Sequence, residues 1–123
     1  MSKLLKAVKR GDLIAVKKLL ESQVSLDDEN SQGWTALFKA AEKGDVKTLQ
    51  LLIDAGADIN HGNRTGITAL FAAVLSGHVE VVKTLLKLGA SVTIKPEGIS
   101  LTKLAMGSKK DEIVQLLRQA GTD

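Results

Sequence analysis

The sequence contains no cysteine, a single proline and few aromatic residues. Without cysteine the chain cannot form disulfides, bind a metal through thiolates or use a cysteine nucleophile. Aromatic residues make up only 2% of the chain, so leucine, valine, isoleucine and alanine must build the core. No apolar run approaches the roughly 20 residues that a membrane-spanning helix needs, and the N-terminus lacks the apolar segment of a signal peptide. We therefore expect a cytoplasmic protein that does not enter the membrane.

Charge is distributed unevenly along the 123 residues, although the net charge is only +3. Residues 1–20 contain six lysine or arginine residues and one acid, Asp12. These cations either solvate an outer surface or form a patch that attracts phosphates or acidic surfaces. The segment has no interleaved aromatic residues and no arginine-rich run, so nucleic-acid binding is not expected.

A six-residue motif occurs twice, 33 residues apart. Gly-Trp-Thr-Ala-Leu-Phe at 33–38 returns as Gly-Ile-Thr-Ala-Leu-Phe at 66–71, and the glycines that follow, Gly44 and Gly77, keep the same spacing. A fixed period between 20 and 50 residues indicates stacked structural units, each of which buries its apolar face against its neighbours.

The sequence pattern of each unit predicts two short helices and a connection rich in turn-forming residues. In the second unit Thr35 is a suitable N-cap, and Gly44 is a suitable end for the first helix. Residues 58–66 are polar and rich in turn-forming residues, which predicts a hairpin-like loop. The apolar stripe of the first helix is Leu37, Ala40 and Ala41, and that of the second is Val46, Leu49, Leu52 and Ile53.

The complete pattern resembles the ankyrin repeat, whose period is 33 residues. The pattern is Gly-x-Thr-Ala-Leu-Phe-x-Ala, then Gly-His-Val-Glu-Val-Val-Lys-x-Leu-Leu, then Gly-Ala-x-Ile-Asn. The family's proline is alanine here, and its histidine is phenylalanine (Phe38, Phe71). The resemblance implies an all-α solenoid of helix–turn–helix units joined by β-hairpin-like loops. One domain, 1–123, would contain an N-terminal cap repeat (1–32), two full repeats (33–65 and 66–97) and a C-terminal cap repeat (98–123).

Polar residues at both ends of the chain replace apolar residues of the central units. Lys18 stands where the other units have Leu51, Thr84 and Leu116. In the last unit, positions that are apolar in the central units are occupied by Thr102, Asp111 and Arg118. Terminal units of a stack need one polar face, so we expect a complete small solenoid.

Residues suited to catalysis or metal binding are sparse. The two histidines have no second histidine or cysteine at metal-ligand spacing. His78 follows the glycine that ends a first helix, where a structural role is expected, and His61 is expected to be solvated in a loop. Asp27-Asp28-Glu29 is typical of an exposed turn, and Asn60 is typical of a residue that stabilises the turn between repeats. We expect no enzymatic activity, no metal and no cofactor.

The resemblance also implies a binding surface, because ankyrin repeats bind proteins through hairpin tips and first-helix surfaces. Trp34, Ile67 and Ile99 hold the same slot of three consecutive units, and either form an apolar row for a partner or pack onto their own hairpins. In the outer units, the first-helix part of this surface would consist of Lys9, Arg10, Gly107 and Ser108. The candidate binding residues are Ser31, Gln32, Trp34, Glu42, Lys43, Arg64, Thr65, Ile67, Leu75, Ser76, Glu97 and Ile99.

These observations favour a non-catalytic protein–protein interaction module, either an adaptor or a small inhibitor. We expect a monomer that binds another protein. The alternative is a nucleic-acid or acidic-surface binder that uses the basic N-terminal cap.

Overall fold

The computed structural model describes residues 2–93, 98–107 and 111–121, which form eight helices and no strand. This arrangement confirms the predicted all-α solenoid. The helices are α1 (Lys3–Arg10), α2 (Leu13–Glu21), α3 (Ala36–Lys43), α4 (Val46–Asp54), α5 (Ala69–Ser76), α6 (Val79–Lys87), α7 (Leu101–Gly107) and α8 (Asp111–Gln119).

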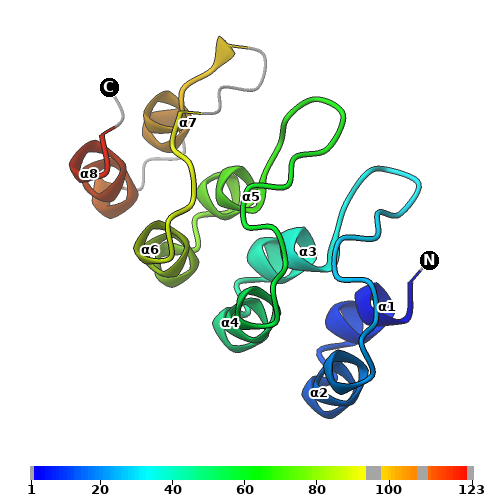
Figure 1. Ribbon diagram of the computed structural model, residues 1–123. Coiled ribbons are helices and arrows are strands. Elements are labelled where there is room, and N and C mark those ends of the chain that lie inside the picture. The colour runs from blue at the N-terminus through cyan, green and yellow to red at the C-terminus, as the bar shows by residue number, and fades with distance from the viewer. Residues whose placement is uncertain (1, 94–97, 108–110, 122–123) are drawn as a thin grey trace.

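The helices are arranged as four stacked pairs (Figure 1). The first helices of the pairs, α1, α3, α5 and α7, form one row, and the second helices form a row behind it. Long loops lead from each second helix to the next first helix and project from the stack beside the first helices. The first helices and the loops therefore share one side of the molecule.

Short polar residues begin the helices. The hydroxyl of Thr35 accepts a hydrogen bond from the Phe38 backbone N–H, and Thr68 does the same for Phe71. Asp45 caps α4 by accepting from the Thr48 backbone N–H. The predicted caps and apolar stripes thus place the helices as expected, with Leu37, Ala40, Ala41, Leu49 and Leu52 buried in one continuous core.

His78 links two neighbouring pairs. It begins α6 but forms no side-chain cap there; instead its Nε2 lies 2.8 Å from the Glu42 carbonyl oxygen at the end of α3. The same ring lies against Gly44, the left-handed residue that ends α3. The expected structural role of His78 is confirmed.

The loops also contact one another. Asp27 accepts a hydrogen bond from the Asp58 backbone N–H, and one period later Asn60 accepts from the Ser91 backbone N–H at 2.7 Å. His61 Nε2 lies 2.5 Å from a Glu29 carboxylate oxygen. The expectation of a solvated His61 is therefore wrong, and the acidic run at 27–29 is more than an exposed turn, because two of its carboxylates join adjacent loops. Asn60 has the expected role.

The last pair is tied to α6 by Lys83, which lies 3.1 Å from Glu112 on α8 and 3.5 Å from Glu80. The hydrogen bond to Glu112 and the two carboxylate charges raise the pKa of Lys83. Lys18, Asp111 and Arg118 are exposed, as expected of polar end faces. Thr102 differs: it is buried with only 2% of its surface exposed, because its position in α7 corresponds to the core residue Leu70.

We predict that Gly44→Ala destabilises the protein more than Gly11→Ala. Both glycines end a first helix with a positive φ, +75° and +72°, so either alanine costs about 1 kcal/mol in backbone strain. A Cβ at Gly44 would also lie 2.8 Å from the His78 ring, whereas at Gly11 its nearest neighbour is the Lys43 Nζ at 3.6 Å. The added crowding should cost about 1–3 kcal/mol more.

Urea unfolding of both variants measures this difference, and the same pair in a His78→Ala background identifies its cause. Without the imidazole, Gly44→Ala should cost no more than Gly11→Ala. Equal costs of the two variants in the wild-type background would contradict the proposed contact.

Candidate functional site

A groove of about 210 Å³ lies where the central two helix pairs meet their loops. We call it the hairpin–helix groove. The residues that line it come from α3, from α5 and from the last loop residues before each helix. They are Trp34, Phe38, Glu42, Ile67, Phe71, Ala72, Leu75 and Ser76.

Two asparagines hold the loop ends of the groove. The Asn30 side-chain oxygen accepts hydrogen bonds from the backbone N–H groups of Gln32 and Trp34, at 2.9 and 3.1 Å. Asn63 accepts from the Thr65 and Ile67 backbone N–H groups in the same way, at 3.0 Å each. Such side-chain to backbone bonds replace ladder bonds in tight turns. They place Trp34 and Ile67 at equivalent points of successive units.

Trp34 both packs on its own unit and lines the groove. Its ring stacks on Phe38 with the centroids 3.9 Å apart and the planes inclined by 12°. Phe38 is buried, whereas Trp34 remains half-buried. The two alternatives that the sequence leaves open for Trp34 are therefore not exclusive: one face of the indole is covered by Phe38, and the side chain still borders the groove.

The far end of the groove combines an exposed apolar residue with polar groups. Leu75 on α5 has 58% of its surface exposed, and Ser76 beside it is also exposed. Glu42 on α3 accepts a hydrogen bond from Lys39 at 2.6 Å, which holds its carboxylate at the rim. An apolar centre with a polar rim is the usual arrangement of a protein-binding surface.

The predicted binding residues lie in different parts of the structure. Five of them line the groove: Trp34, Glu42, Ile67, Leu75 and Ser76. Ile99 is 41% exposed in the loop before α7 and does not line this groove. Glu97, and Ser108 of the C-terminal unit, lie outside the described residues. The remaining hairpin residues are exposed in the loops, and they are Ser31, Gln32, Arg64 and Thr65.

Lys43 has a structural role that the sequence does not reveal. Its Nζ donates to the carbonyl oxygens of Val8 and Lys9, at 3.0 and 2.8 Å, in the last turn of α1. Carbonyls at a helix C-terminus carry partial negative charge and lack partners within the helix, so a cation stabilises them. We therefore leave Lys43 out of the proposed binding surface.

Three groove residues were missing from the sequence-based set: Phe38, Phe71 and Ala72. Both phenylalanines occupy the slot of the family's histidine, which was interpreted as a scaffold position. Their recurrence four residues after Trp34 and Ile67 was the available signal, since residues at that spacing meet on one side of a helix start.

The described residues contain no group of three or more histidine, cysteine, aspartate or glutamate side chains that could hold a metal ion. No described helix is long and apolar enough to cross a membrane. Both histidines are engaged in contacts between neighbouring units, with Glu42 and Glu29.

A family model described as ankyrin repeats (3 copies) matches residues 4–96 of the chain. The match includes all but the first residue of α1 and continues through α6, and it therefore includes the whole hairpin–helix groove. No curated protein sequence matches the chain.

We predict that Lys43→Ala lowers the free energy of unfolding by about 0.5–1 kcal/mol, since a cation at a helix C-terminus contributes about that amount. Lys47→Ala on α4 is the matched control, because Lys47 is an exposed lysine of the same unit that caps no helix. Its unfolding free energy should change by less than about 0.5 kcal/mol. Thermal and urea unfolding measure both, and equal stability of the two variants would refute the capping role.

Proposed function

Because the chain belongs to the ankyrin-repeat family, we propose that it is a non-catalytic module that binds a protein partner through the hairpin–helix groove. Ankyrin repeats are generally protein–protein interaction modules and are typically not enzymes. The observation that carries the proposal is the groove itself, an apolar surface between α3 and α5 that is bordered by Trp34 and exposes Leu75.

The size and lining of the groove favour a protein segment over a small metabolite. Pockets for drug-sized ligands measure roughly 300–1,000 Å³ and bury most of the ligand. At about 210 Å³ this groove is smaller, and it suits one or two apolar side chains of a partner. Aromatic residues such as Trp34 are frequent among the residues that dominate interface energies.

The neighbouring loop tips extend the proposed surface. Gln32 and Arg64 are exposed in successive loops, close in sequence to Trp34 and Ile67. Polar groups at the edge of an apolar contact fix orientation and exclude other partners. In this proposal the apolar groove provides affinity and the loop tips provide specificity, as an adaptor or a small inhibitor requires. We propose that the chain acts as a monomer in the cytoplasm.

The proposal predicts that Leu75→Ser weakens partner binding about tenfold or more, because an exposed apolar residue that a partner buries as an anchor contributes over about 1 kcal/mol. Ile14→Ser is the matched control: Ile14 is a large apolar residue on α2, is 70% exposed and lies outside the groove. Both variants should keep the wild-type stability within about 0.5 kcal/mol, since both side chains are exposed.

The measurement begins with affinity capture from the source organism, using wild type and both variants as bait. A partner should be retained by wild type and Ile14→Ser and be depleted with Leu75→Ser, and its purified form should show the same order in Kd. Equal retention by all three baits would refute the groove. Capture of nucleic acid, lost steeply with rising salt, would instead support the basic N-terminal alternative.

A further inference from the structure

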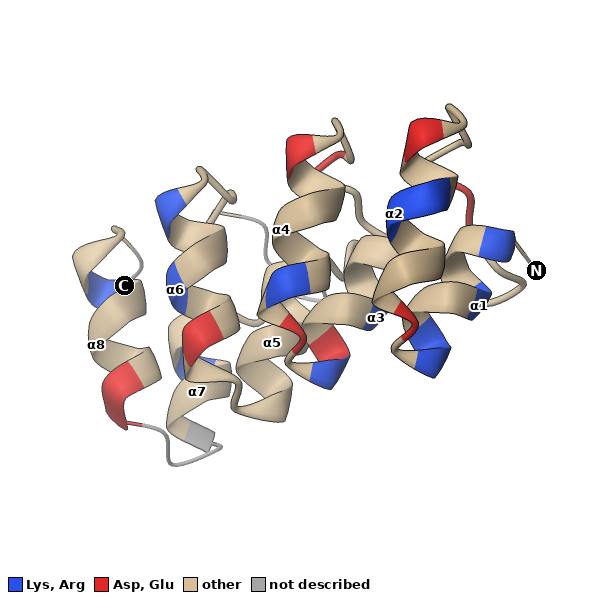
Figure 2. Cartoon of the chain, turned by 90° about the horizontal axis from the view of Figure 1, so that it is seen from below, with Lys and Arg blue, Asp and Glu red and all other residues tan. Residues whose placement is uncertain are grey.

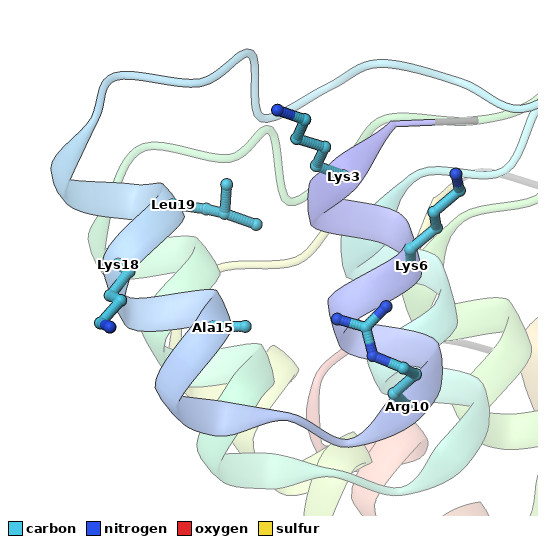
Figure 3. A pocket seen from close by; sticks show the side chains of 6 residues that line it. All are labelled: Lys3, Lys6, Arg10, Ala15, Lys18 and Leu19. Carbon is cyan, nitrogen blue, oxygen red and sulfur yellow. The ribbon is translucent and has the colours of Figure 1, made fainter.

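A second groove, of about 320 Å³, opens on the outer face of the first helix pair, at the N-terminal end of the stack (Figure 3). We call it the end groove. Leu19 and Ala15 point from α2 toward α1, and the Arg10 guanidinium reaches from α1 toward α2. Three lysines flank this apolar floor. The lining residues are Lys3, Lys6, Arg10, Ala15, Lys18 and Leu19.

The positive charge of the end groove is mostly uncompensated. Asp12 lies 3.9 Å from Arg10, and it also caps α2 by accepting from the Ala15 backbone N–H. Within the described ranges no carboxylate forms an ion pair with Lys3, Lys6 or Lys18, and all three are exposed. Figure 2 shows the cations of this pair gathered on α1 and α2. The groove therefore attracts an acidic surface.

The repeat period shows what kind of surface fits the floor. The equivalent positions of the next pair lie 33 residues later. Lys3, Ala15 and Leu19 correspond to Ala36, Thr48 and Leu52. Those three residues are buried, with 2%, 2% and 0% of their surface exposed, and α3 and α4 pack against α1 and α2. The end groove thus has the shape of a helix-docking face, and none of the described helices lies on it.

Arg10 strengthens this interpretation. It corresponds to Lys43, whose ammonium caps the C-terminal carbonyls of the helix docked against α3. Arg10 carries the same charge at the same position of the open face, so it can donate to the last carbonyls of a helix placed there.

We propose that the end groove binds an amphipathic helix of a protein partner that carries acidic side chains on the edges of its apolar stripe. The apolar stripe of the partner helix packs on Ala15 and Leu19, and its acidic side chains contact the three lysines. The C-terminal carbonyls of the partner helix accept hydrogen bonds from Arg10. This site is separate from the hairpin–helix groove, which lies between α3 and α5.

A second copy of the chain fits the groove less well. The last pair exposes Arg118 as well as Asp111 and Glu112, and Lys83 already engages Glu112. Nucleic acid would use the cations but has no apolar stripe for the floor.

The test uses a fluorescein-labelled, stapled 14-residue helical peptide with a leucine–alanine stripe flanked by glutamates, and a second peptide with glutamine in place of each glutamate. Fluorescence polarisation should show saturable binding of the acidic peptide below about 1 mM and at least tenfold weaker binding of the glutamine peptide. Arg10→Ala should weaken binding several-fold. Lys9→Ala, which removes an exposed cation outside the groove, should leave it unchanged.

Ala15→Lys separates docking from simple charge attraction. The variant adds a positive charge and also fills the floor, so docking predicts at least tenfold weaker binding, whereas unspecific attraction predicts tighter binding. Tighter or unchanged binding to Ala15→Lys overturns the proposal, and so does the absence of saturable binding. Preferential binding of a 20-bp DNA duplex, or concentration-dependent self-association in sedimentation that Ala15→Lys abolishes, also overturns it in favour of the other two occupants. Circular dichroism checks that each variant is folded.

Discussion

Each helix pair has an apolar face that only a neighbouring pair can cover, and the rest of the structure depends on this contact. Ala40 and Ala73 of the first helices are fully buried in a core that runs through all four pairs. Small side chains at these positions let consecutive first helices approach closely. Polar contacts cross the same junctions, from Lys43 to the end of α1 and from His78 to the end of α3.

Both candidate sites follow from this stacking. The hairpin–helix groove forms because α3 and α5 lie side by side. Asn30 and Asn63 hold the preceding loops through hydrogen bonds, so that Trp34 and Ile67 both line the groove. The end groove is the equivalent face of the first pair, on which none of the other described helices lies. A repeat scaffold fixes the spacing of such surfaces, while the few residues that differ between repeats determine what binds.

The scaffold could be predicted from the sequence because its signals recur with a fixed period. The cap Thr35 and the apolar stripes lie as expected, and Thr68 repeats the cap one period later. The errors concern residues whose role depends on a neighbouring unit. The sequence alone shows no partner for the polar side chains of Lys43 and His61, because their partners are 32 to 35 residues away. Thr102 was expected on a polar end face. It is buried instead, because the direction of stacking determines which side of a terminal unit its neighbour covers. The Trp34–Phe38 stack could not be inferred, since ring orientation depends on loop geometry.

The central claim is that a protein partner docks across the junction between α3 and α5. Hydrogen exchange measured by mass spectrometry, on the free chain and on its complex with the captured partner, tests this claim most directly. The account predicts slower exchange in residues 30–44 and 63–77, with little change in α4 and α6, which lie in the second row of helices. Slower exchange confined to α4 and α6 would contradict it.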